Sequence, residues 1–553
     1  MDSTSRINRT LMGKLNLVKR FAADAAALVR GIQASYLPPL MIYAAAGISG
    51  LTGIVGTFFV KEYLGLSAEF LAMLGFWAGI PWALKMPLGH LVDLLWRWKY
   101  IMVFIGAALI GVSLTIMYGL IQSPAAMGQY MSIEAWYVVA ALVAPIGYVV
   151  QDVVADAMTV EAVPVIDNAG NRFDAQTIKS MHTTMQTLGR VAIVGGGILV
   201  SAANILMFKG VGDMAEAEKV RTYAQIYLAA MIIPLISVAG VLFALALKWL
   251  QARRLRRLGF SAAQVREMTE KPDEAVSVNW WILGGGLVYT VFTLVIGLRQ
   301  VTYDQEIVFV GSMAIVLFLM TRLLQELTLE QRRNLLGTAV IIFVFRALPG
   351  PGAGSTWWQI DKLGFDQQFI ATLSLISGAL ALFGMVIFRR FMAEKSIAYV
   401  VAFLTIAGSL LSLPIIGMYY GLHHWTSALT RGVVDARFIA IVDTALESPL
   451  GQVAMIPMLA WIANSAPSQL KATFFAVMAS FTNLALSMAS LGTKYLNKVF
   501  VVTREVKDPV TAMVAVPENY SELGILLITV TFIGLFLPML TIFIVQRSRW
   551  RSS

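Results

Sequence analysis

The chain has 553 residues, of which 58% are hydrophobic and 13% charged, and it contains no cysteine. Soluble proteins carry about a quarter charged residues and just under half apolar ones, so the composition argues against a soluble enzyme, a disordered scaffold or a fibrous protein. Without cysteine the chain forms no disulfide, thiolate-bound zinc or iron–sulfur site. The net charge of +10 favours basic loops facing anionic lipid over binding to nucleic acid.

Apolar runs recur along the whole chain. A membrane-spanning helix needs about 20 mostly apolar residues, and lipid leaves no water to satisfy an open sheet edge. We therefore expect an all-α polytopic membrane protein with about 14 transmembrane helices. In chain order the runs are 39–60, 68–90, 100–121, 135–160, 181–207, 223–247, 280–298, 306–321, 334–352, 367–388, 396–418, 437–463, 472–493 and 523–545.

The distribution of Lys and Arg predicts the orientation. With the N-terminus inside, the inner connections hold 27 basic residues and the outer ones 12. The positive-inside rule then places both termini in the cytoplasm. Residues 1–38 carry six basic residues and lack a signal-peptide cleavage site, so we interpret them as a retained cytoplasmic segment. We expect a multi-pass protein of a bacterial inner membrane.

The runs divide into two sets of six with a pair between them. Residues 64–79 (LGLSAEFLAMLGFWAG) and 363–378 (LGFDQQFIATLSLISG) share six of sixteen positions, at the entry to the second span of each set. This repeat favours a duplicated six-helix unit. The expected parts are a cytoplasmic segment, an N-terminal bundle, a basic connector, an inserted helix pair, a C-terminal bundle and a tail, at 1–38, 39–249, 250–279, 280–333, 334–546 and 547–553.

Four motifs resemble those of known transporters. Gly89, Asp93 and Arg97 resemble the motif that major-facilitator proteins carry between helices two and three. Three further motifs resemble the folate–biopterin transporter family: PWALK at 81–85, DVVADAMTVE at 152–161, and a pattern running from Gly451-Gln452 through Asn483 to Gly492. The resemblance implies a major-facilitator fold and secondary transport of a pterin- or folate-like metabolite, with no enzymatic activity and no cofactor. The inserted pair departs from the usual twelve-helix plan.

Ionisable residues inside membrane spans are expensive and point to function. Counted along their helices, Lys85, Asp152 and Arg190 lie roughly 12–14 Å from the inner side, close to one plane. Asp152 and Asp156 are four residues apart, so both face one side of their helix. Two adjacent carboxylates in a low dielectric resist double ionisation, which suits a proton carrier. The alternative is a structural ion pair with Lys85 or Arg190.

Arg346 precedes a stretch rich in proline and glycine, where it suits a substrate carboxylate or phosphate; the alternative is pairing with Asp443 or Glu447. Trp82 and Trp357 suit stacking on a planar ring, or anchoring at the membrane interface. Together with Lys85, Arg190, Gln452 and Asn483, these residues form the expected substrate site. Gly89, Asp93, Arg97 and Glu161 form the expected conformational gate, and for Glu161 the alternative is a helix-end salt bridge with Arg172 or His182.

These features favour a proton-coupled permease for a small, planar, anionic metabolite. The expected partners are this substrate, protons and the lipid bilayer, and the expected state is a monomer. His423 and His424 lack nearby carboxylates, so we expect no metal site. Two alternatives stay open: a muropeptide permease, whose family shares a string like Gln151-Asp152 followed by Asp156-Ala157, and a non-transporting assembly factor for pigment or protein complexes.

Overall fold

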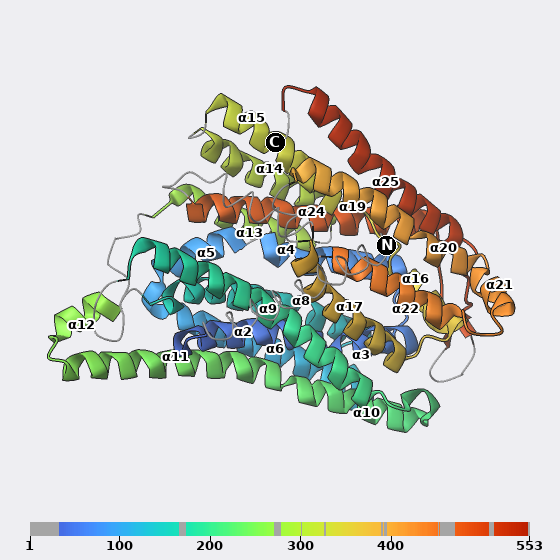
Figure 1. Ribbon diagram of the computed structural model, residues 1–553. Coiled ribbons are helices and arrows are strands. Elements are labelled where there is room, and N and C mark those ends of the chain that lie inside the picture. Colours follow the sequence, from blue (N-terminus) through green and yellow to red (C-terminus); the bar gives the residue numbers. More distant parts are fainter. Residues whose placement is uncertain are drawn as a thin grey trace, which may run out of the picture.

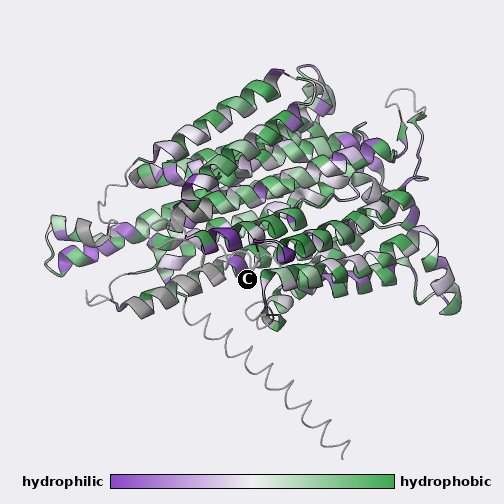
Figure 2. Ribbon diagram, turned by 90° about the horizontal axis from the view of Figure 1, so that it is seen from above, coloured by the Kyte–Doolittle hydropathy of each residue, from purple (hydrophilic) through white to green (hydrophobic). Residues whose placement is uncertain are grey.

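The computed structural model describes residues 32–83, 85–164, 173–269, 278–299, 301–325, 328–388, 391, 395–451, 453, 471–507 and 514–550. Within them the chain is helical apart from a short ribbon, β1 (Val506–Lys507) paired with β2 (Val514–Val516). Eleven segments of this described part are long and apolar enough to cross a membrane. Hydrophobic residues dominate along the helices (Figure 2), as the composition predicts for a multi-pass membrane protein.

The first set of helices, the N-terminal helices, follows the predicted runs with small shifts at the ends (Figure 1). Its members are α2 (Leu37–Ile48), α3 (Gly53–Tyr63), α4 (Ala68–Ala83), α5 (Lys85–Leu94), α6 (Lys99–Gln122), α8 (Ile133–Ala162), α9 (Ala175–Met207), α10 (Glu216–Ala230) and α11 (Ile232–Arg257). The 3-10 turn η2 (Ser49–Thr52) joins α2 to α3, and the short helices α7 (Pro124–Gly128) and α12 (Ala262–Thr269) lie in connections.

The inserted pair is α13 (Trp280–Arg299) and α14 (Asp304–Leu324). The C-terminal helices follow it. They are α15 (Leu329–Arg346), α16 (Ala353–Leu363), α17 (Gln367–Ile387), α19 (Ile397–Leu411), α20 (Leu413–Tyr419), α21 (Leu422–Leu429), α22 (Ala436–Glu447), α24 (Lys471–Val499) and α25 (Leu523–Arg547). The predicted run 437–463 coincides with α22 at its start, and most of its second half lies outside the described residues.

The predicted run 334–352 is too long, because α15 ends at Arg346 and the chain is not helical again until Ala353. Pro349 and Pro351 have no N–H to continue a helix, and Gly352 has a φ of 76°. Helix α24 satisfies part of the exposed backbone, since Thr493 Oγ1 accepts from the Gly350 N–H at 2.9 Å.

Small residues let neighbouring helices approach closely. A Cβ on Gly47 of α2 would lie 2.2 Å from the Ile193 carbonyl oxygen of α9, and one on Gly106 of α6 would lie 2.7 Å from the Gly147 carbonyl oxygen of α8. Membrane helices associate through such contacts because lipid provides no hydrophobic driving force between them. These contacts fix α2, α6, α8 and α9 against one another.

The N-terminal and C-terminal helices meet along two seams. At one seam α4 packs on α24, where Cβ atoms on Gly75 and Gly79 would lie 3.8 and 3.5 Å from the hydroxyls of Ser490 and Ser487. At the other seam α9 packs on α17, and a Cβ on Gly378 would lie 2.9 Å from Ile198. The colours of Figure 1 show the two sets lying against each other along these helices.

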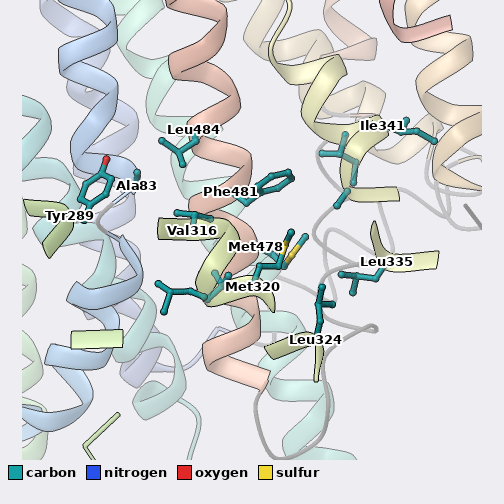
Figure 3. Packing of buried hydrophobic residues seen from close by; sticks show 14 of the residues in the cluster. Ala83, Tyr289, Val316, Met320, Leu324, Leu335, Ile341, Met478, Phe481 and Leu484 are labelled. Carbon is teal, nitrogen blue, oxygen red and sulfur yellow. The ribbon is translucent and has the colours of Figure 1, made fainter. Parts of the chain in front are cut away.

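The inserted pair covers the first seam. Tyr289 of α13 donates to the Ile80 carbonyl of α4 at 3.5 Å, while Glu306 of α14 pairs with Lys494 of α24 at 2.8 Å. Figure 3 shows apolar residues of the inserted pair, among them Val316 and Met320, beside residues of α24 such as Phe481. The pair therefore contacts both sets of helices.

Candidate transport site

A lysine and two aspartates meet inside the N-terminal helices. Lys85, the first residue of α5, places its Nζ 2.5 Å from Asp152 Oδ2 and 2.8 Å from Asp156 Oδ2. Both aspartates lie on α8, one turn apart and on one face. The side chains of Lys85 and Asp152 are 22% and 19% exposed, while that of Asp156 is 45% exposed. Solvent therefore reaches the cluster at Asp156.

Tyr43 of α2 completes this cluster, and the sequence analysis did not identify it. Its hydroxyl donates to Asp156 Oδ1 at 2.5 Å. Gly189 on α9 makes room for the ring, since a Cβ there would lie 2.9 Å from it. The neighbouring Arg190 is exposed, and its charge acts on Asp152 and Tyr43. The predicted charges Lys85, Asp152, Asp156 and Arg190 thus stand around one point, on helices α5, α8 and α9.

Gln151 holds α8 in place beside the cluster. Its Nε2 donates to the Val103 carbonyl of α6 at 3.2 Å, and its Oε1 accepts from the Ser237 hydroxyl of α11 at 3.0 Å. The residue is buried, so both groups need partners inside the protein. This anchoring fixes the direction in which the next residue, Asp152, points.

Glu161 lies in a second charged group, near the end of α8. It pairs with Lys99 of α6 at 2.9 Å and with Lys248 of α11, and it accepts from the Tyr100 hydroxyl at 3.0 Å. The expected partners, Arg172 and the side chain of His182, lie outside the described residues, and the described partners come from α6 and α11. We call this the basic end of the molecule and the opposite end the far end.

The alternative role of Arg346, an ion pair with Asp443 or Glu447, does not occur among the described residues. Arg346 Nε donates to the Thr482 carbonyl of α24 at 3.2 Å, and no ion pair joins it to Asp443 or Glu447. Because the helix breaks directly after Arg346, its side chain reaches α24 rather than α22. A backbone carbonyl leaves the positive charge of the guanidinium uncompensated.

The remaining predicted substrate residues are placed differently. Asn483 Nδ2 donates to the Trp82 carbonyl at 3.1 Å, which joins α24 to α4. Trp357 is 2% exposed, so it is no interfacial anchor. Gln452 and the side chains of Asp93 and Arg97 lie outside the described residues. A Cβ on Gly89 would meet nothing within 4 Å, so no close contact requires this glycine.

A cavity of about 430 Å³ lies between the charged cluster and the far end. Tyr148 lines it one turn before Asp152 on α8, and Trp357 of α16 also lines it. The other lining residues are uncharged and come from the N-terminal helices and α16; the hydroxyl-bearing ones are Ser49, Thr52, Thr57, Ser113, Tyr137, Tyr227 and Thr356. We call this space the hydroxyl cavity. A separate cavity of about 480 Å³ lies between α15 and α25.

Polar contacts join the two sets of helices at the far end. Lys61 of α3 pairs with Asp361 of α16 at 2.5 Å. Gln367 of α17 donates to the Tyr223 hydroxyl of α10 at 2.7 Å. Lys61 and Asp361 are 15% and 22% exposed, so the pair is partly shielded from water. The molecule is thus closed at the far end by contacts that rearrangement of the two sets would break.

Arg504, in the connection between α24 and α25, adds to this closure. It donates to the Leu64 carbonyl after α3, and its guanidinium lies 4.7 Å above the Trp357 ring. The residue is 3% exposed, and burial lowers its pKa to about 10. Arg504 thus covers the hydroxyl cavity from the far side of Trp357.

The sequence was compared with protein-family models and with named proteins. The model of the BT1 family matches residues 46–550. The chain belongs to the BT1 family. Among named relatives, the folate-biopterin transporter of Synechocystis is 22% identical over 535 residues, covering 94% of this chain and 84% of the relative. The putative folate transporter 2 of Plasmodium berghei is 27% identical over 163 residues, covering 29% and 34% of the two chains.

Solved structures show the fold of this BT1 chain. A POT family transporter in complex with 5-aminolevulinic acid has a TM-score of 0.60 at 12% identity, covering 93% of this chain and 95% of the other. A nucleoside transporter has a TM-score of 0.51 at 12% identity, covering 92% and 99%. The expected major-facilitator fold is therefore confirmed. The BT1 chain is a multi-pass membrane transporter for a small molecule, not an enzyme, and the relatives favour neither a muropeptide permease nor an assembly factor.

Proposed function

We propose that this BT1 protein couples proton movement to the transport of a small, planar, anionic metabolite of the pterin or folate class. The contact that carries the proposal is the bridge from Lys85 to both Asp152 and Asp156. One lysine neutralises one carboxylate, so the second one is balanced by the charge of Arg190 or by a proton. Asp156 is the more exposed of the two, so water reaches the pair from its side.

Protonation of the cluster changes which anionic groups bind Lys85. When both aspartates are ionised, Lys85 stays bound between them, and Tyr43 donates to Asp156. When one aspartate is neutral, Lys85 loses part of its attraction and becomes available to a substrate anion. Proton and anion then enter together, which is the coupling that a symporter needs.

The substrate class is supported by the relatives and by the cations. The name of the Synechocystis relative specifies folate and biopterin, which are planar ring compounds. Arg190 and Arg346 supply the charge for a carboxylate or phosphate. We assign Trp82, Trp357, Gln452 and Asn483 to the same site. The position of Trp357 in the lining of the hydroxyl cavity supports this assignment for that residue.

We also propose how the site opens. Gly89, Asp93, Arg97 and Glu161 form a gate at the basic end, which the three partners of Glu161 support. The bundles at 39–249 and 334–546 rock about the site, with 280–333 as the inserted pair and 250–279 as the connector. The excess of basic residues supports cytoplasmic termini, and we propose a monomer in a bacterial inner membrane.

The coupling role is tested by Asp152→Asn in purified protein reconstituted into proteoliposomes. Uptake of labelled folate or biopterin driven by a pH gradient should be lost, because the variant can no longer lose and gain the proton at this position. Counterflow exchange of the same compound should continue, because exchange needs no net proton movement.

Glu134→Gln is the matched control for this experiment. Glu134 is an exposed carboxylate in the first turn of the same helix, α8, far from Lys85. Its replacement should leave both activities unchanged. If Asp152→Asn keeps pH-driven uptake at the level of Glu134→Gln, Asp152 does not couple protons and the proposal fails.

A further inference from the structure

We infer that the hydroxyl cavity binds the uncharged ring system of a planar heteroaromatic substrate, while the acid group of the substrate points toward Lys85 and Arg190. The orientation of the acid group rests on the proposed function, whereas the ring site rests on the cavity itself. None of the described residues that line the cavity is a cation, so among them an anionic group has no partner. The cavity and the charged cluster thus suit the two ends of one ligand.

The cavity and the charged cluster follow one stripe along α8. Tyr137, Ala144 and Tyr148 line the cavity, and Asp152 comes four residues after Tyr148. Four residues of a helix correspond to roughly 6 Å and return the chain to the same face. A bicyclic ring beside Tyr148 therefore places a substituent of its edge within reach of Asp152 and Lys85.

The lining groups are arranged to accept hydrogen bonds from a ligand. Three of the small hydroxyls already donate to backbone carbonyls: Ser49 to Ala46 at 2.7 Å, Thr57 to Gly53 at 3.0 Å, and Ser113 to Ala140 at 2.7 Å. Each of these oxygens keeps lone pairs that can accept a bond. Ring amino groups and ring N–H groups are donors of the matching kind.

The walls of the cavity suit a flat ring. Trp357 and Tyr148 both line the cavity, and aromatic side chains pack favourably on aromatic rings. Arg504 lies against Trp357 at 4.7 Å, and no acceptor among the described residues takes its Nε or Nη1 hydrogen bonds. The volume of about 430 Å³ lies in the range of small-molecule sites, about 300–1,000 Å³.

The absence of cysteine in the whole chain makes a direct test possible. In Ala144→Cys the single thiol lines the cavity, and in the control Ile146→Cys it lies on the exposed side of the same helix, where Ile146 is 42% exposed. Unsubstituted pterin, which is a neutral ring without an acid group, should slow the reaction of a small thiol reagent with Ala144→Cys at least fivefold. The reaction of Ile146→Cys should be unchanged.

A second variant fills the cavity. Ala144→Phe should lower the affinity for pterin at least tenfold, measured by quenching of pterin fluorescence, while Ile146→Phe adds the same bulk outside the cavity and should bind normally. Thermal unfolding of both variants checks that each is folded. If pterin does not bind, does not protect Ala144→Cys, or binds Ala144→Phe as tightly as Ile146→Phe, the ring site is refuted.

The two proposals fail separately. Loss of pterin binding in Ala144→Phe together with normal pH-driven uptake in Asp152→Asn overturns the coupling role alone. Loss of coupling in Asp152→Asn with unchanged pterin binding in Ala144→Phe overturns the ring site alone.

Discussion

Lys85 lies where a single side chain can contact both carboxylates of α8. Lys85 begins the described part of α5, two residues after Ala83, the last described residue of α4. Pro81 lies inside α4 and leaves a backbone carbonyl without its usual helical partner. The Ser480 hydroxyl of α24 donates to the Ala83 carbonyl at 2.9 Å, so the C-terminal helices stabilise the backbone from which Lys85 projects.

The role of Arg346 is tested by Arg346→Ala. Its guanidinium is balanced by a carbonyl rather than by an acid, so we expect binding of pterin-6-carboxylate to weaken about tenfold or more, since charged hydrogen bonds contribute about 1.5–3 kcal/mol. Binding of unsubstituted pterin should change little. Fluorescence titration measures both, and Arg346→Lys, which keeps the charge, is the control. Equal losses for the two ligands would indicate a structural arginine.

The charged residues of the site could be predicted from the sequence better than their partners. Helix depth alone placed Lys85, Asp152 and Arg190 in one layer, because charges inside a span are few. Tyr43 was missed because a tyrosine in an apolar helix has the same pattern as an ordinary packing residue. The contacts of Glu161 with Lys99 and Lys248 were not predicted, because spatial neighbours on other helices leave no trace in local sequence.

At the scale of elements, glycines decide how closely helices pack. A Cβ on Gly47 would lie 2.2 Å from a backbone oxygen that cannot move without its helix, and a Cβ on Gly196 would lie 2.9 Å from Gly47 Cα. Gly53, which begins α3, has nothing within 4 Å of the same position. The two kinds of glycine are indistinguishable by residue type.

The close contact of α2 and α9 is tested by Gly47→Ala. We expect the free energy of unfolding to fall by about 1–3 kcal/mol, the usual effect of overpacking, because the added methyl group meets the Ile193 carbonyl. Gly53→Ala is the matched control and should not destabilise the protein. Thermal unfolding in one detergent compares the two variants, and equal melting temperatures would contradict the contact.

Helix positions could be predicted closely, and helix interruptions less so. The apolar runs predicted the spans because the thickness of the bilayer sets the length of each run. The run 396–418 consists of α19 and α20, since Pro414 near the start of α20 cannot continue the helix before it. The end of α15 at Arg346 follows from the prolines after it, although the apolar character of the run continues.

At the scale of the whole molecule, the structure is closed at the far end while Asp156 is open to solvent. The closure crosses between the N-terminal and C-terminal helices at Lys61 and Asp361 and at Tyr223 and Gln367. Arg504 adds a third crossing through the Leu64 carbonyl. Alternating access requires these contacts to break and form again in each cycle.

The pair of Lys61 and Asp361 is tested by exchanging its charges. Lys61→Asp places two acids together at the far end. The fraction of molecules that are open there should rise about fivefold, which corresponds to the ~1 kcal/mol that a partly shielded ion pair contributes. The double variant Lys61→Asp with Asp361→Lys should restore closure. The reaction rate of a single thiol, introduced as Thr57→Cys in the cavity lining, measures the opening.

An impermeant thiol reagent added from the far-end side reports closure in these variants. The thiol of Asp361→Asn should react at a rate between that of the wild-type pair and that of Lys61→Asp, because this substitution removes the attraction without adding repulsion. If the thiol reacts no faster in Lys61→Asp than with the original pair, this ion pair does not close the far end. The same conclusion follows if the exchanged pair does not restore the slow rate.

The two seams have a consequence for the route of the cargo. At the first seam, glycine and serine bring α4 and α24 within side-chain contact, and the inserted pair covers them. At the second seam, Gly378 packs on Ile198. A lipid-dissolved molecule entering sideways along these described stretches would first have to separate these contacts.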